Sequence, residues 1–329
     1  MVGQVHVELR SRNPATWPVI SHAGYDYCAI VPAAAYRCVI SVESGVVMEP
    51  SNNELVSVVI PTKNSAAFLE NCLKSIADQT YPNVEVVVVD SGSTDSTEKV
   101  SACYGARYYT YAPVLPSGTF DAPHKRNYGA KQAVGDYIYI VDSDMELMPN
   151  VVKDAVELCN KGYDAVVIPE DSFGIGIWAR AKNLERRCYW GDATVEAPRF
   201  VKKHIWDRLG GLDETVGGND DWDFYQKLLD NGSRVGRTRS IVRHNEGYLK
   251  LSKLFRKRFM YGRDVAKYIA KRPGAAAMSY FPVRKSYLNH WRLFLARPVD
   301  TAAFIVMRTT EYLGGLSGIV YSLTMSKRA

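Results

Sequence analysis

The first strong signal in this chain is LVSVVIPTKNSAAFLENCLKSIADQTYPNVEVVVVD, residues 55–90. Its two ends, LVSVVIP (55–61) and VEVVVVD (84–90), are nearly continuous β-branched runs, as expected for strands that are buried on both faces. The segment between them carries apolar residues at helical spacing, namely Phe68, Leu69, Cys72, Leu73 and Ile76. The stretch therefore predicts a strand–helix–strand unit with parallel strands.

The alternation of strands and helices continues along the chain. We expect a second helix to begin near Ser93 to Asp95 and a third strand at Ala106–Tyr111. After a loop (112–123) and a short helix, GDYIYIVDSD (135–144) predicts a fourth buried strand. Such alternation predicts an α/β fold with a doubly wound, mostly parallel sheet, whose ligands lie at the carboxyl ends of the strands.

The remaining elements and the domain limits are less sharply marked. Residues 195–203 and 233–244 resemble short strands, and they flank a helix that begins near Asp220. Residues 173–190 and everything after Leu249 read as helical. We expect three regions: a weakly structured N-terminal extension (1–50), a central α/β domain (51–248) and a basic, amphipathic, helical C-terminal region (249–329).

Composition and charge exclude some protein classes. Of the 329 residues, 47% are hydrophobic and 23% are charged, which fits neither a disordered chain nor a polytopic membrane protein. The net charge of +6 is concentrated, because Lys250–Arg272 contains nine Lys or Arg and one acid, Asp264. Charge alone does not decide whether this segment faces nucleic acid, anionic lipid or a phosphorylated substrate.

Cysteine spacing and the N-terminus both favour a cytoplasmic protein. The six cysteines form no CxxC pair and lack the spacing of a zinc site or a disulfide scaffold. The N-terminus lacks the basic start and apolar run of a secretory signal. We therefore expect reduced thiols and a location in the cytoplasm.

Asp142, Ser143 and Asp144 form a DxD at the end of a predicted buried strand. Two carboxylates this close repel each other unless a cation or hydrogen-bond donors hold them. Mn²⁺ or Mg²⁺ that bridges to a diphosphate satisfies both, because such an ion takes one or two carboxylates and completes its shell with phosphate and water oxygens. A plain turn after a strand is the alternative.

Four motifs in order, VSVVIPTKNSAAFLENCLKSI, EVVVVDSGSTDST, KRNYGAKQAVGDYIYIVDSD and GGLDETVGGNDDWDFYQKLLDNG, are similar to those of the family 2 glycosyltransferases. The resemblance covers residues 55–250 and implies the GT-A fold. It also implies inverting, metal-dependent transfer of a sugar from a UDP- or GDP-sugar to a glycan or lipid-linked acceptor.

The resemblance assigns a donor site to several strand ends. Pro61, Thr62 and Asn64 lie at the end of the first strand, and Asp90 and Ser91 lie at the end of the second. Asp90 would form a hydrogen bond to the nucleotide base. Asp90 could instead only initiate a helix.

A second group of donor residues lies further along the chain. Arg126 and Asn127 match an Arg-Asn-x-Gly segment near the donor phosphates, and Asp142 and Ser143 complete the donor site. Lys125 stands where relatives often carry a small residue, so an exposed helix start is an open alternative for this segment.

The same resemblance identifies a base and metal ligands. Asp221 aligns with the base of the usual Glu-Asp pair, and Asp220 replaces the Glu. Asp144 is the expected main ligand of Mn²⁺ or Mg²⁺, with Asp142 and His244 as the other candidates. The alternative is that the two adjacent acids only favour a helix N-terminus.

The roles of two further side chains remain open at this point. Trp222 would offer a flat wall to a sugar ring. Arg199 either approaches the site or lies on the surface.

The C-terminal region suggests contact with a membrane surface. Leu249–Arg272 mixes apolar and basic residues as an interfacial helix does, although a helix packed on the catalytic domain fits the same pattern. Thr301–Met325 is apolar, but its longest charge-free run, Tyr312–Ser326, is 15 residues, too short to span a bilayer. We expect a shallowly inserted or protein-packed segment at the cytoplasmic membrane face.

Other functions remain possible on the sequence. A polyprenyl-phosphate glycosyl synthase would need less help from a base, because its acceptor phosphate is already anionic. A nucleotidyltransferase typically carries a Gly-rich loop after the first strand, which PTKNSAAF lacks. A non-catalytic carbohydrate-binding protein would not need Asp90, Asp142, Asp144 and Asp221 together. No nucleic acid partner is expected.

Overall fold

The computed structural model describes residues 54–113, 115, 119–274 and 284–326. It also describes two short antiparallel strands, β1 (Ile20–His22) and β2 (Tyr25–Tyr27). The rest of the predicted N-terminal extension lies outside the described residues.

Seven strands form the central sheet in the order β11-β8-β10-β6-β3-β4-β5. All neighbours run parallel except β10, which is antiparallel to both β6 and β8. The predicted α/β fold with a mostly parallel sheet is therefore confirmed. The strands are β3 (Val56–Thr62), β4 (Val84–Asp90), β5 (Arg107–Thr110), β6 (Tyr137–Ile140), β8 (Ala165–Val167), β10 (Phe200–Lys202) and β11 (Val235–Arg237).

Helices cover both faces of this sheet. Val58 belongs to one core and its neighbour Val59 to the other, because side chains alternate along a strand. The first core includes buried residues of α1 (Ala66–Ala77) and α4 (Val151–Asn160), and α2 (Thr97–Cys103) packs beside α1. The second core includes residues of α3 (Ala122–Gln132), α6 (Lys203–Arg208) and α7 (Asp220–Asp230).

A second sheet extends from the carboxyl edge of the first. Its order is β7 (Met145–Leu147), β12 (Val242–Tyr248) and β9 (Glu170–Ile175). β7 follows the DxD directly, and its Met145 pairs with His244 of β12. This pairing brings two segments a hundred residues apart to one place.

Three predicted boundaries differ from the structure. Only Phe200–Lys202 of the expected strand 195–203 is a strand, since Pro198 has no N–H to offer a ladder. The expected strand 233–244 is split between β11 and β12, which belong to different sheets. The expected helix 173–190 begins later, because β9 continues to Ile175.

The start of α2 is also later than expected. Ser93 and Asp95 remain in the loop before α2, where their side chains bond backbone groups of the β3–α1 loop. The helix therefore begins at Thr97.

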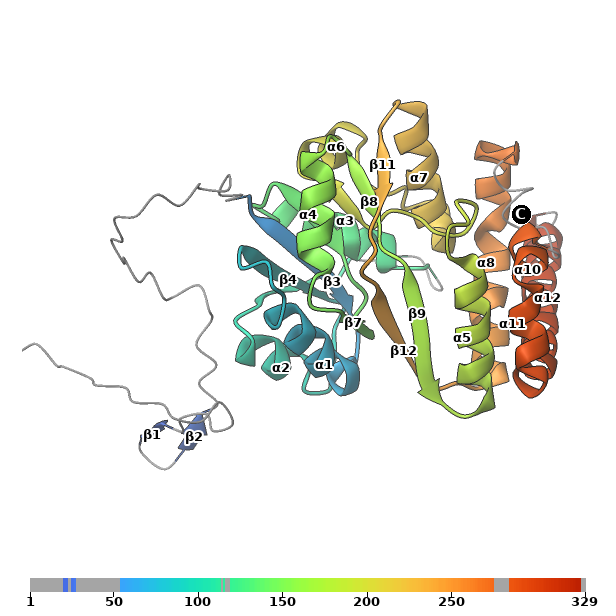
Figure 1. The fold of residues 1–329 in the computed structure, drawn as a ribbon, viewed down its shortest axis with the longest axis horizontal. Helices are drawn as coiled ribbons and strands as arrows, with labels where there is room; N and C mark the ends of the chain where they lie inside the picture. The colour runs from blue at the N-terminus through green and yellow to red at the C-terminus, as the bar shows by residue number, and fades with distance from the viewer. Residues whose placement is uncertain are drawn as a thin grey trace, which may run out of the picture.

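The C-terminal helices stack beside the second sheet. In Figure 1, β9 and β12 lie between the central sheet and the group formed by α5, α8 and α12. α12 packs along α8 and against α5. None of the helices in the described residues has the length and hydropathy needed to cross a bilayer. The helices are α5 (Ile177–Tyr189), α8 (Leu251–Lys271), α10 (Lys285–Asn289), α11 (Trp291–Ala296) and α12 (Pro298–Ser326).

Candidate active site

The loops after β3 and β4 are tied together by Asp90. Its Oδ2 accepts the N–H groups of Gly92 (2.8 Å) and Ser93 (2.7 Å), and its Oδ1 accepts the Thr62 hydroxyl (3.0 Å). Burial would raise the pKa of Asp90, but these hydrogen bonds outweigh burial and lower it. Both carboxylate oxygens of Asp90 are therefore engaged by groups of the two loops. The predicted hydrogen bond to the nucleotide base would have to share Asp90 with these donors or displace them.

Other predicted donor residues line the same loops. Asn64 adopts a left-handed conformation with φ of 50°, its N–H donates to Ser93 Oγ (2.6 Å), and its side-chain oxygen accepts the N–H of Thr94 (2.8 Å). Ser143 Oγ lies 3.0 Å from Ser65 Oγ. Pro61, near the end of β3, is paired with Val89 of β4. The structure thus brings the first two strand ends and the DxD loop to one edge of the sheet.

Lys125 on α3 is buried and is not an exposed helix-start residue. Its Nζ donates to Thr62 O and to Ser91 Oγ, both at 3.1 Å, and pairs with Asp121 at 3.2 Å. Burial lowers the pKa of Lys125 despite the nearby Asp121. Lys125 therefore fastens both donor-site loops to α3.

Asn127, two residues after Lys125 on α3, faces a different loop. Its side-chain oxygen accepts the N–H of Leu212 and its Nδ2 donates to Leu212 O, both at 2.9 Å. Nδ2 also donates to Glu214 at 2.9 Å. Asn127 therefore positions the loop before α7, and its predicted contact with a donor phosphate has no free polar atom to use in this arrangement.

Two arginines, the buried Arg126 and the partly buried Arg199, hold the acidic residues together. Arg126 donates through Nη2 to Asp142 (2.8 Å) and through Nη1 to Asp220 (2.8 Å) and Asp221 (3.2 Å). Arg199 reaches Asp142 at 3.0 Å and Asp221 at 3.6 Å. Arg199 therefore belongs to the site and not to the surface.

This pairing shifts the titration of Asp142. Burial alone would raise its pKa, but Arg126 and Arg199 outweigh burial and hold the pKa of Asp142 far below its usual range. Each Asp142 oxygen accepts from one guanidinium group. Direct coordination of a metal by Asp142 would have to share its oxygens with these arginines or displace one of them.

The adjacent acids at the start of α7 differ in exposure. The side chain of Asp220 is 2% exposed, whereas that of Asp221 is 31% exposed. Asp220 is therefore a buried partner of Arg126, and Asp221 is the carboxylate that a ligand can reach. Trp222, beside them, donates its Nε1–H to Val195 O at 3.0 Å.

Asp144 and His244 meet across the β7–β12 pairing. His244 Nε2 lies 3.2 Å from Asp144 Oδ2, and its Nδ1 lies 3.4 Å from Glu170 Oε2. Burial would lower the pKa of His244, but the two carboxylates outweigh it and raise this pKa to about 10. No group of three or more His, Cys, Asp or Glu in the described residues could hold a metal without other ligands.

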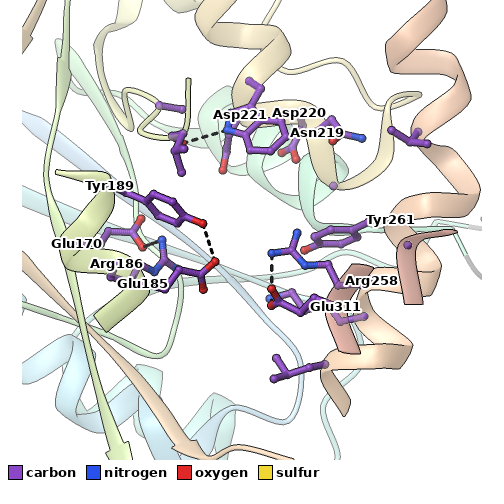
Figure 2. Close-up of a pocket in the computed structure, with 18 of the residues that line it drawn as sticks. Glu170, Glu185, Arg186, Tyr189, Asn219, Asp220, Asp221, Arg258, Tyr261 and Glu311 are labelled. Carbon is purple, nitrogen blue, oxygen red and sulfur yellow. Dashed lines mark hydrogen bonds and ion pairs between the residues drawn. The ribbon is translucent and has the colours of Figure 1, made fainter. Parts of the chain in front are cut away.

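A cavity of ≈ 440 Å³ opens from His244 toward the C-terminal helices, and Asp144 does not line it. Figure 2 shows Asp220 and Asp221 on one side, Glu170, Glu185, Arg186 and Tyr189 on another, and Arg258, Tyr261 and Glu311 facing them from α8 and α12. Asp142, Arg126, Arg199 and His244 also line the cavity. The predicted site residues at the first two strand ends do not line it.

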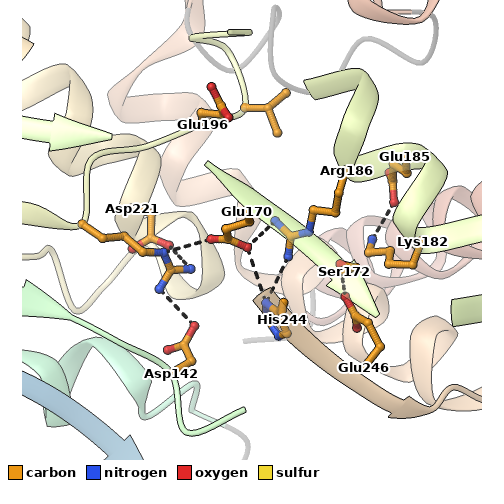
Figure 3. Close-up of polar contacts among 12 residues, drawn as sticks. Asp142, Glu170, Ser172, Lys182, Glu185, Arg186, Glu196, Asp221, His244 and Glu246 are labelled. Carbon is orange, nitrogen blue, oxygen red and sulfur yellow. Dashed lines mark hydrogen bonds and ion pairs between the residues drawn. The ribbon is translucent and has the colours of Figure 1, made fainter. Parts of the chain in front are cut away.

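Several charged residues of this cavity were not predicted from the sequence. Glu170 at the start of β9 pairs with Arg186 at 2.7 Å and with Arg199 at 3.2 Å (Figure 3). Glu311 of α12 pairs with Lys182 of α5 at 3.4 Å and with Arg258 of α8 at 3.5 Å. Glu311 could have been noticed because it and Arg308 are the charged residues of the largely apolar segment 301–325. Glu170 lies in no motif, so its sequence context gave no such signal.

Comparison with protein-family models matches residues 57–212 to "Glycosyl transferase family 2". The chain is 34% identical over 116 residues to glycosyltransferase GlyG of Streptococcus pneumoniae, covering 35% of this chain and 38% of that protein. It is 33% identical over 200 residues to an uncharacterized glycosyltransferase of Rickettsia typhi, covering 53% of this chain and 58% of that protein. The chain thus spans well under two thirds of the length of these curated relatives.

Among solved structures, the chain is similar to the mannosyltransferase PcManGT of Pyrobaculum calidifontis in complex with GDP-Man and Mn²⁺. The TM-score is 0.57 at 21% identity, and the match covers 84% of this chain and 88% of that one. At this identity the similarity establishes the fold. Residues 57–212 of the chain therefore form a glycosyl transferase family 2 region, and the fold is of the GT-A type.

Proposed function

We propose that the chain is an inverting glycosyltransferase that moves a sugar from a nucleotide-diphosphate sugar to a glycan or lipid-linked acceptor. The observation that carries the proposal is the placement of Asp221: it is the exposed carboxylate of the acidic pair, it lines the cavity, and Arg126 and Arg199 link it to Asp142. A base that faces an open cavity beside the donor edge of the sheet is what a single displacement requires.

Asp144 and His244 are the proposed ligands of a divalent cation, which would replace the proton that the neighbouring carboxylates hold on His244. An octahedral ion with bonds of ~2.1 Å holds neighbouring ligand atoms roughly 3 Å apart, which fits the 3.2 Å between Asp144 Oδ2 and His244 Nε2. Oxygens of the donor diphosphate and water would complete the shell, in keeping with Mn²⁺ or Mg²⁺. When bound, the cation would stabilise negative charge on the departing nucleoside diphosphate. The Mn²⁺ in the mannosyltransferase complex is consistent with this proposal.

The chain's own residues would perform the other tasks. Asp221 accepts the proton of the acceptor hydroxyl as that oxygen attacks the anomeric carbon. Arg126 fixes the direction of the Asp221 carboxylate through its 3.2 Å contact and, through Asp142, ties it to the DxD loop. One carboxylate is sufficient, so no covalent intermediate on the enzyme is involved, and the product has the inverted configuration.

The test compares nucleoside diphosphate release by the wild type and by Asp221→Asn. A panel of UDP- and GDP-sugars is supplied with Mn²⁺ and a membrane lipid extract as the source of acceptor. Asp221→Asn should bind the donor normally but turn over roughly 10²–10⁴-fold more slowly, because it has lost the base. Asp207→Asn, which changes an exposed carboxylate on α6, is the matched control. Near-normal turnover of Asp221→Asn would show that the base lies elsewhere, and no release from any donor would refute sugar transfer.

A further inference from the structure

α12 presents a long uncharged face to solvent. The exposed positions follow one another at alternating steps of three and four residues, so they lie along one side of the helix over roughly 36 Å. Leu313 and Val320, near its middle, are 55% and 59% exposed. The positions are Val299, Ala302, Val306, Thr309, Leu313, Leu316, Val320 and Leu323.

The two short helices before α12 also expose apolar side chains, and α11 packs against α12. Leu288 of α10 and Trp291 and Leu295 of α11 are exposed large apolar residues on the segment that leads into α12. The guanidinium of Arg292 lies 5.6 Å from the centre of the Trp291 ring. Exposed Trp beside Arg and Leu is the composition of segments that lie at a membrane–water boundary.

Charges around the face are positive. Residues 249–326 contain only three acids, and each is paired: Asp264 with Arg263, Asp300 with Arg180, and Glu311 with Lys182, Arg258 and Arg308. By contrast, besides Lys257, which lines the cavity, five exposed cations of the same helices form no ion pair within the described part of the chain, namely Lys253, Arg256, Lys267, Lys285 and Arg292. Unpaired cations beside an apolar face complement anionic lipid.

We propose that the face formed by α10, α11 and α12 docks on an anionic lipid surface. The same spacing of three and four residues describes a coiled-coil seam, so a second copy of the chain is the competing occupant. Coiled coils in water usually carry charges beside the seam, whereas here the flanking positions Ile305, Thr310, Ser317, Ile319 and Thr324 are uncharged. An uncharged surface wider than a seam fits a lipid layer better than a partner helix.

Docking in this way would place the cavity beside the membrane. Leu316 both belongs to the exposed face and lines the cavity, together with Ile269 of α8 and Ile319. The cavity therefore has an apolar side at α8 and α12, opposite the carboxylates of α7. A lipid-linked acceptor could then reach Asp221 from the membrane; this consequence rests on the proposed function, whereas docking itself does not.

Flotation of the full chain with vesicles tests the docking surface. Vesicles of phosphatidylcholine alone are compared with vesicles that contain about 30% phosphatidylglycerol. The wild type should float with the anionic vesicles, and added salt should weaken binding. Leu313→Glu combined with Val320→Glu should lower binding roughly tenfold, since two charges then enter the docked face. Its thermal unfolding midpoint should be unchanged, because both side chains face solvent.

Matched controls separate this surface from general effects of added charge. Met148→Glu combined with Leu229→Glu makes the same change at exposed apolar positions outside the C-terminal helices and should bind as the wild type does. Asp221→Asn should also float normally, which distinguishes failure of docking from failure of catalysis. Wild-type protein that does not float, a face variant that floats as well as the wild type, or equal binding to neutral vesicles would overturn the proposal. A wild-type dimer that the face variant dissociates, without vesicle binding, would assign the face to a second copy.

Discussion

Asp220 and Asp221 are adjacent in the chain but differ in their electrostatic surroundings. Asp220 is buried, and burial first, then the neighbouring Asp221, raises the pKa of Asp220 to about 7 in spite of Arg126. Its pKa in the unfolded chain is near the ordinary value of 3.8. The folded protein therefore holds a proton on Asp220 more tightly than the unfolded chain does, and ionising Asp220 costs folding free energy.

This difference predicts a pH-dependent effect of Asp220→Asn. The cost of ionisation is absent below about pH 4 and complete above about pH 7, so the variant should gain stability over the wild type as the pH rises. Asn removes the charge, and Arg126 keeps Asp142 and Asp221 as partners. We expect a gain near pH 8 that shrinks toward zero near pH 4, measured by urea unfolding across this range. Asp207→Asn should show no such trend, and a gain for Asp220→Asn that does not vary with pH would contradict the account.

For single residues, the acidic side chains of the site were predictable from the sequence, but most of the residues that contact them were not. Asp142, Asp144 and Asp221 stand in motifs where carboxylates are recognisable. Glu170 begins β9 and Arg199 directly precedes β10, both in stretches without a motif. Their roles arise only because these strands place Arg199 within ion-pair distance of both Glu170 and Asp142. Asn127 fits its motif, yet its amide is engaged by Leu212.

α8 and α12 approach each other closely at three glycines. A Cβ added at Gly318 would lie 2.1 Å from Phe259 O, and one at Gly314 would lie 2.5 Å from Phe255 O. A Cβ at Gly262 would lie 2.1 Å from Gly315 O. These glycines weaken an isolated helix, but here they allow two backbones to meet. The packing of α12 on the protein depends on their missing side chains.

Substitution of two neighbouring glycines separates these effects. Gly318→Ala should destabilise the protein by roughly 1–3 kcal/mol, because the added methyl group overlaps the backbone of α8. Gly315→Ala is the control, since its Cβ would meet nothing within 4 Å, and it should be neutral or stabilise by ~0.5–1 kcal/mol. Thermal or urea unfolding measures both variants. Equal effects would show that the helices do not pack as described.

The strand–helix alternation was predictable because its apolar periods are long and regular. Residues 55–90 form β3, α1 and β4 within a residue or two of the expected limits. The short elements after Ile168 were not, because three-residue strands such as β10 and β11 carry too few residues for a period to appear. The antiparallel direction of β10 also has no signature in its sequence.

In the whole molecule, the C-terminal helices complete the cavity that begins at the carboxyl edge of the central sheet. The family match ends at residue 212, yet α7, α8 and α12 supply much of the cavity wall. The GT-A fold followed from motif order, but the cavity did not, because it depends on how α12 packs against α5 and α8. The central claim is that Asp144 and His244 bind a cation together with a nucleoside diphosphate at the edge of the sheet, next to the Asp221 base.

Calorimetry of UDP and GDP binding, with Mn²⁺ and with EDTA, tests this claim most directly. We expect one of the two nucleotides to bind the wild type with Mn²⁺ and to lose roughly 10–100-fold in affinity when EDTA is added or when Asp144 is changed to Ala. Glu157→Ala, an exposed change on α4, should behave as the wild type does. Affinity that is the same with Mn²⁺, with EDTA and in Asp144→Ala would contradict the proposed metal site.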